Sequence, residues 1–129
     1  MKYLSDYMEA KQTALFKKTG TFFAFNKEQY EQRKKDNITY VNLGQGMLTE
    51  KANVKEVING LNKIYKDSIK QDIKENGKDS IILRELYNHE AFYVGSIEDT
   101  IHKLEDYPFT KNDILKVYQK NYEEATKHW

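Results

Sequence analysis

The sequence contains no cysteine, only one proline and only six glycines. The absence of cysteine excludes disulfide frameworks, thiol catalysis and cysteine-ligated zinc sites. With so little proline and glycine there is no evident linker or internal repeat. No apolar run approaches the roughly 18 residues that span a membrane, and residues 1–10 lack the apolar segment of a secretory signal. We therefore expect one soluble, cytoplasmic, globular domain over residues 1–129, without membrane contact.

Arginine is also scarce: the chain has two Arg against 19 Lys, and its formal net charge is +1. Such a balance gives no overall field that would draw the protein to nucleic acid or to a membrane. The charge is unevenly distributed, because residues 1–64 carry 11 Lys/Arg against seven Asp/Glu and residues 65–129 carry ten against 13. Hydrophobic residues make up 39% of the chain, so ten Tyr and six Phe must supply much of the buried area.

The first half of the chain combines helical and extended patterns. Apolar spacing predicts a helix over residues 5–18 that ends at Gly20, and strands are predicted over residues 21–25 and 38–43. Between these strands, Asn26 opens a capping-box-like pattern for a helix over residues 27–35. A sheet of two strands is marginal in water, so we expect helices on one face and a strand edge open to another chain.

The second half is predicted to be entirely helical. Four helices are expected, over residues 53–76, 81–92, 97–107 and from residue 110 onward. Asp79 or Ser80 is expected to cap the second of these helices, Ser96 the third and Thr110 the last. The predicted fold class is α+β and mainly helical, with five or six helices around a small two- or three-stranded sheet.

The most distinctive polar pattern is the segment that contains Glu85, Asn88, His89, Glu90 and Tyr93. On a helix, the first three share one face, where a carboxylate can orient an imidazole and raise its basicity. A small metal-assisted hydrolase or nucleotide-handling enzyme could use Glu85, His89 and Glu90 in this way. A metal site needs at least three ligands, however, and the same spacing is typical of a surface ion pair. We therefore favour a structural role and expect no resident metal and no cofactor.

Gly44, Gln45 and Gly46 follow the second predicted strand. Glycines after a strand can form a phosphate-binding loop, but neither the P-loop pattern nor the dinucleotide-binding pattern is present. The next predicted helix also begins seven residues later, too far for its N-terminus to meet a phosphate at the turn. A tight strand exit is the favoured interpretation.

Basic residues surround the aromatic run near residue 22, and they are Lys17, Lys18, Arg33, Lys34 and Lys35. Basic and aromatic residues together can form a platform for single-stranded nucleic acid. Arginine, the preferred group for binding phosphates and bases, is nearly missing, and some of the aromatic side chains must enter the core. Solvated lysines over an aromatic core are the favoured interpretation.

Four segments together resemble a known family: Phe22-Phe-Ala-Phe, the turn with Gly44 and Gly46, the helix from Glu85 to Tyr93, and Tyr107-Pro108. The chain resembles a family of small uncharacterised proteins carried by phages, prophages and other mobile elements. Tyr30 stands where the resemblance leads us to expect Phe. The resemblance implies a mobile-element setting and no known activity, so it transfers no catalytic role.

Three hypotheses about function follow. The leading one is a non-enzymatic phage or mobile-element protein that binds a host protein, such as a component of a defence system, in the cytoplasm of a bacterial host. Its expected binding residues are Gly44, Gln45, Gly46, Glu85, Asn88, His89 and Tyr93. The enzyme described above and a nucleic-acid binder that uses the basic residues are the alternatives. Self-association by edge-strand pairing is compatible with all three, and the C-terminal Trp129 either docks on the protein or anchors a partner.

Overall fold

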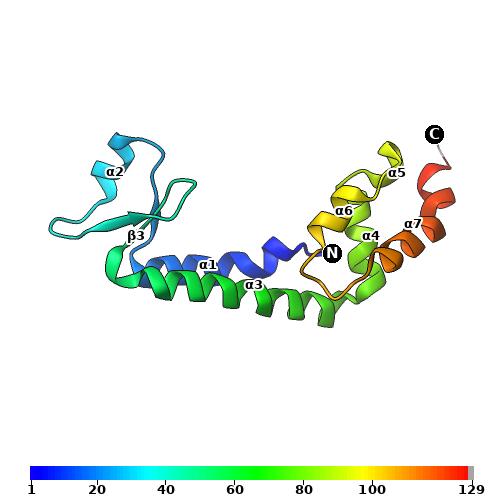
Figure 1. Cartoon of the computed structure of the whole chain (residues 1–129), viewed down its shortest axis with the longest axis horizontal. Helices are drawn as coiled ribbons and strands as arrows, with labels where there is room; N and C mark the ends of the chain where they lie inside the picture. Colours follow the sequence, from blue (N-terminus) through cyan, green and yellow to red (C-terminus); the bar gives the residue numbers. More distant parts are fainter. Residues whose placement is uncertain (128–129) are drawn as a thin grey trace. The chain divides into compact units, whose positions relative to one another are not determined.

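The computed structural model describes residues 1–127, so Trp129, the candidate partner anchor, lies outside the described residues. Within residues 1–127, seven α-helices and three short strands confirm the mainly helical α+β class (Figure 1). The chain forms two compact units, an N-terminal unit (Lys2–Ser68) and a C-terminal unit (Ile69 onward), and α3 (Val54–Asn76) belongs to both. The expectation of one globular domain stays a prediction. No helix in the described part of the chain has both the length and the apolar character that crossing a membrane requires.

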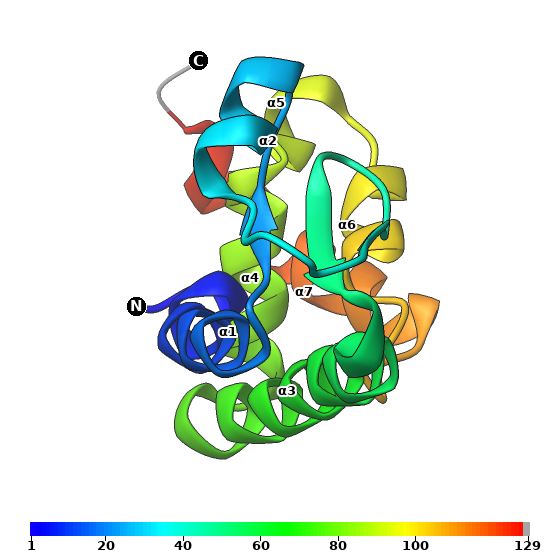
Figure 2. The ribbon, with the colours of Figure 1, turned by 90° about the vertical axis from the view of Figure 1, so that its left-hand side faces the viewer.

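Two helices lie side by side in the N-terminal unit, namely α1 (Leu4–Thr19) and the first part of α3 (Figures 1 and 2). Gly60 permits their close approach, because a Cβ atom at this position would lie 2.8 Å from both terminal methyl groups of Leu15. Helix α1 ends as predicted at Gly20, whose φ of 70° lies in the left-handed region that glycine adopts without steric cost.

The strands β1 (Phe22–Phe23), β2 (Tyr40–Asn42) and β3 (Met47–Glu50) form an antiparallel sheet in the order β1-β3-β2. The sequence pattern predicts no helix or strand over residues 47–50, although these residues form the central strand of the sheet. Only four residues long, β3 shows too little alternation to predict a strand, and its pairing with both neighbours determines it. The other two strands form at the predicted places and are shorter than expected.

One face of this sheet is covered by α2 (Lys27–Arg33), which begins at Asn26 as predicted. The rings of Phe22, Tyr30 and Tyr40 pack against one another there, with centroids 5.3 to 6.4 Å apart. A buried chain of hydroxyl groups from Thr19, Thr21 and Thr49 lies elsewhere in the unit, with oxygens 2.8 and 2.9 Å apart. The turn η1 (Lys51–Asn53) then leads from β3 into α3.

The C-terminal unit contains the rest of α3 with α4 (Lys78–Asn88), α5 (Ala91–Val94), α6 (Glu98–Lys103) and α7 (Lys111–Thr126). Its buried apolar side chains are Ile69, Ile81, Ile82, Leu86, Ala91, Phe92, Leu104, Tyr107, Ile114 and Val117. The capping box of α7 is confirmed, because the Asp113 backbone N–H donates to Thr110 Oγ1 and the Thr110 backbone N–H donates to Asp113 Oδ2.

Three local predictions for this unit are wrong. The single helix over residues 81–92 is two helices, because Glu90 has a φ of 54° and breaks the helical path. Helix α4 begins directly after Gly77, so neither Asp79 nor Ser80 is its cap. The helix predicted over residues 97–107 ends at Lys103 and begins after Ile97 rather than Ser96, although Ser96 Oγ accepts from the Glu98 backbone N–H at 3.3 Å. Each error concerns a helix end, where one or two hydrogen bonds decide the boundary.

Candidate interaction surfaces

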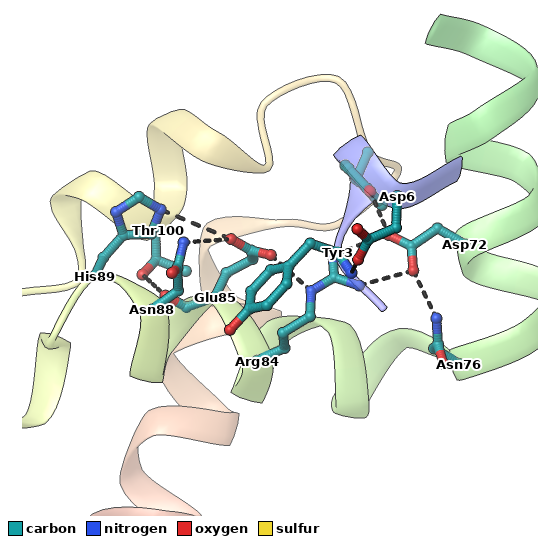
Figure 3. Close-up of polar contacts among 10 residues, drawn as sticks. Tyr3, Asp6, Asp72, Asn76, Arg84, Glu85, Asn88, His89 and Thr100 are labelled. Carbon is teal, nitrogen blue, oxygen red and sulfur yellow. Dashed lines mark hydrogen bonds and ion pairs between the residues drawn. The ribbon is translucent and has the colours of Figure 1, made fainter. Parts of the chain in front are cut away.

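Glu85, the central residue of the predicted polar site, lies in a buried ionic network of the C-terminal unit. Arg84 Nε donates to Glu85 Oε2 at 2.7 Å, while its Nη1 and Nη2 donate to the two carboxylate oxygens of Asp72 at 2.8 and 2.9 Å. Figure 3 shows these side chains meeting between α3 and α4. Since both Glu85 and Asp72 are fully buried, neither carboxylate is presented to a substrate or a partner in this structure.

Asp72 accepts further hydrogen bonds from the Tyr107 hydroxyl and from Asn76 Nδ2. Burial would raise the pKa of the Asp72 carboxyl, but the hydrogen bonds from Arg84, Tyr107 and Asn76 outweigh it, so its pKa lies below the usual value. Burial and the neighbouring carboxylate raise the pKa of Tyr107 well above that of an exposed tyrosine. The network therefore holds Asp72 charged and Tyr107 neutral at physiological pH.

His89 and Asn88 lie at the outer end of this network. His89 Nε2 is 3.7 Å from Glu85 Oε1 and has no hydrogen-bond partner among residues 1–127, whereas Asn88 Nδ2 approaches the same oxygen at 3.5 Å. Thr100 Oγ1 donates to the Glu85 backbone carbonyl at 3.3 Å. In the part of the chain that the structure describes, no three His, Asp or Glu side chains are grouped so as to hold a metal ion.

The rest of the predicted site is directed to solvent by the break at Glu90. The Glu90 backbone N–H donates to the Tyr87 carbonyl and the Glu90 carbonyl accepts from the Tyr93 N–H, at 3.1 and 3.0 Å. Helix α5 is then closed by Gly95, whose φ is 72°. Glu90 is exposed and Tyr93 is 76% exposed, so these two residues are separated from the buried Glu85 of the same motif.

Aromatic side chains of α4, α5 and α7 form a row beside this break. Tyr87, Phe92, Tyr118 and Tyr122 follow one another with ring centroids 5.2, 5.0 and 5.7 Å apart, and the middle two rings are parallel within 5°. Phe92 is buried. The exposed apolar residues of this row and of α5, which also carries Phe92, are Tyr87, Tyr93, Val94 and Tyr122, and we call them the aromatic face; they are 52%, 76%, 58% and 46% exposed. Exposed tyrosines are typical interface anchors.

The predicted glycine turn lies in the other unit, where it joins β2 to β3. Gly44, Gln45 and Gly46 have φ values of 101°, 54° and 80°, all in the left-handed region. A Cβ atom at Gly46 would lie 2.6 Å from the ring of Phe25, so this glycine provides space for that ring. The turn is a hairpin connection, and β2 has a neighbouring strand on one side only.

A shallow hollow of about 430 Å³ lies beside this edge. Its lining residues are Ala24, Phe25, Asn26, Lys27, Tyr30, Tyr40, Asn42 and Leu48. Two of these amides are engaged locally, because Asn26 Oδ1 accepts from the Gln29 backbone and Asn42 Oδ1 accepts from the Gly44 backbone. The hollow is a second candidate surface of the N-terminal unit.

The basic residues proposed for nucleic-acid contact are mostly engaged within the chain. Lys18 pairs with Glu56 at 2.9 Å, and Lys34 pairs with Glu31 at 3.1 Å. The Arg33 guanidinium lies over the Phe22 ring, 5.4 Å from its centroid. Three of the five residues proposed for nucleic-acid contact therefore have intramolecular contacts.

Sequence reasoning missed the partners of Glu85 and most of the aromatic face. Asp72 lies three residues after Ile69 on the apolar stripe of α3, and a carboxylate at that position is the signal that could have indicated a buried ion pair. Tyr87 and Tyr122 follow the same helical apolar pattern as the buried residues of their helices. Nothing in the sequence separates them from buried tyrosines.

Comparisons with known proteins identify a family and no activity. The model of a family of unknown function, DUF7659, matches residues 4–125, and the chain belongs to this family. The expected membership of an uncharacterised family is therefore confirmed. Searches of curated proteins and of solved structures found no match.

Proposed function

We propose that this DUF7659 member is a non-enzymatic protein that binds another protein through the aromatic face of its C-terminal unit. The observation that carries the proposal is the exposure of Tyr87, Tyr93, Val94 and Tyr122, of which Tyr87 and Tyr122 pack on the rings of Phe92 and Tyr118. Tyrosine offers a large contact area and loses little conformational entropy on binding, so such residues dominate many interfaces.

The resemblance to mobile-element proteins gives the proposal its biological setting. The partner is then a host protein in the cytoplasm of a bacterium, and its inhibition or recruitment would serve the element, for example against a defence system. The enzymatic alternative receives no support from Glu85, because this carboxylate is buried and neutralised by Arg84.

The test is capture of a partner with matched variants. Wild-type protein, a Tyr93→Ser/Tyr122→Ser variant and a Phe25→Ser variant are immobilised and incubated with nuclease-treated bacterial lysate. Phe25 is the control, because its ring is 73% exposed but belongs to the N-terminal unit. Circular dichroism first establishes that all three proteins are folded.

We expect the wild type and Phe25→Ser to capture the same protein and the double tyrosine variant not to capture it. The captured protein, once purified, should form a complex with the purified wild type. Capture that depends on Phe25 and not on Tyr93 would transfer binding to the hollow of the N-terminal unit. A failure to reconstitute any complex that depends on Tyr93 and Tyr122 would overturn the proposed role of the aromatic face.

A further inference from the structure

The segment that contributes Tyr87, Tyr93 and Val94 to the aromatic face contains exposed carboxylates and no Lys or Arg. Residues 85–102 contain Glu90, Glu98 and Asp99 as exposed acidic residues and no Lys or Arg. Arg84, which precedes this stretch, is buried in its ion pairs with Asp72 and Glu85. The backbone of Glu90 is hydrogen-bonded to both Tyr87 and Tyr93, so this exposed residue lies next to two members of the face.

Lys116 and Lys120 of α7 lie on a different side of that helix from Tyr118 and Tyr122. Lys116 and Lys120 line a separate hollow of about 260 Å³ together with Lys78 and Asp113, and Lys78 Nζ lies 3.4 Å from Asp113 Oδ1. Tyr118 and Tyr122 are one helical turn apart, whereas Lys120 lies two residues from each and therefore points to the opposite side of the helix. Lys116 and Lys120 therefore point away from Tyr118 and Tyr122, whereas Lys111 lies on the same side two turns before Tyr118.

The net charge of the whole C-terminal unit is also negative. Residues 69–127 carry nine Lys/Arg against 12 Asp/Glu, whereas residues 2–68 carry 12 against eight. Electrostatic complementarity at interfaces favours partners of opposite charge and disfavours like charge. An acidic partner segment would bring carboxylates against Glu90.

We infer that the partner segment that docks on the aromatic face is basic and places Arg or Lys side chains over its tyrosine rings. This inference rests on the proposed function and specifies the chemistry of its partner. The face of an aromatic ring attracts a cation, and a guanidinium also stacks on it. Glu90 adds an ion pair at the edge of the same contact.

The experiment selects binders from a random 16-residue peptide library displayed on yeast. Wild-type protein, Tyr93→Ser/Tyr122→Ser and Glu90→Lys serve as baits, and Glu28→Lys is the control because it makes the same charge change on exposed α2. Peptides that bind the wild type and not the double tyrosine variant are sequenced and compared with the unselected library. The best of them is synthesised for affinity measurements at two salt concentrations.

We expect these face-dependent peptides to be enriched in Arg and Lys. Their affinity should fall about threefold to fivefold with Glu90→Lys, remain unchanged with Glu28→Lys and weaken as salt increases. Face-dependent peptides that are acidic or purely apolar, or a library without any face-dependent binder, would overturn the inference.

Two outcomes separate this inference from the proposed function. A reconstituted host partner that needs Tyr93 but contacts the face with neutral or acidic residues would leave the function standing and remove the basic partner. Self-association in analytical ultracentrifugation that is lost in the double tyrosine variant would assign the face to a second copy of the chain, and it would also overturn the inference.

Discussion

Arg84 binds both carboxylate oxygens of Asp72, at 2.8 and 2.9 Å, from the first turns of the next helix in the chain. Its Nε is simultaneously occupied by Glu85, so one guanidinium is shared by two buried carboxylates. The arrangement connects α3 and α4 within the C-terminal unit and directs the most conspicuous carboxylate of the sequence inward. The exposed groups beside it are then the ones available for binding.

Replacing Arg84 by Met should destabilise the protein strongly. It would leave the carboxylates of Asp72 and Glu85 buried without their cation, and breaking a buried pair in this way costs about 3–5 kcal/mol. Chemical denaturation measures the change in the free energy of unfolding. The control is Lys78→Met, which removes the exposed pair with Asp113 and should cost no more than about 1 kcal/mol. Equal losses in both variants would contradict the central role of Arg84.

The stability of the protein should decrease in acid because of Asp72. Its pKa lies below the ordinary value in the folded state, and an unfolded Asp titrates near pH 4. As the pH falls below about 5, the unfolded chain takes up a proton that the folded chain does not, so the free energy of unfolding decreases. Denaturant titrations between about pH 2 and pH 6 should show a smaller pH dependence for Asp72→Asn. The exposed Asp79→Asn should keep the wild-type dependence, and identical slopes for both variants would refute this assignment.

Alanine substitutions at Gly44 and Gly46 in the hairpin turn should destabilise the protein to different extents. Both Gly44 and Gly46 have positive φ, so either change introduces backbone strain of about 1–2 kcal/mol. Gly46→Ala additionally places a Cβ atom 2.6 Å from the Phe25 ring, whereas a Cβ at Gly44 meets nothing within 4 Å. We therefore expect Gly46→Ala to lower the melting temperature more. The reverse order would show that Phe25 does not pack on the turn.

Single-stranded nucleic acid should bind weakly, if at all. Lys18, Arg33 and Lys34 are engaged by side chains of the chain itself, and of the five proposed residues this leaves Lys17 and Lys35 for phosphates. Fluorescence anisotropy with a labelled oligonucleotide at about 150 mM salt should show no saturable binding. Tight binding that weakens steeply with salt and is lost in a Lys17→Ala/Lys35→Ala variant would restore the nucleic-acid hypothesis.

The sequence by itself determined the helical elements, several of their ends and the class of fold. Helix ends form as predicted at Gly20, Asn26 and Thr110. A left-handed residue or a side-chain cap at a helix end satisfies backbone groups only a few residues away, so the local sequence is sufficient to predict it. The long apolar stripe of α3 is equally local, since its period alone marks a helix.

Only the tertiary structure decided which side chains are available to a partner. Glu85 and Tyr93 belong to one sequence motif, yet Arg84 and Asp72 bury the first, and the turn at Glu90 exposes the second. Likewise, β3 is a strand because it pairs with β1 and β2. The burial of a side chain and the pairing of a strand depend on residues that are distant in the sequence. A local pattern of apolar and polar residues does not show which distant residues will contact that side chain or pair with that strand.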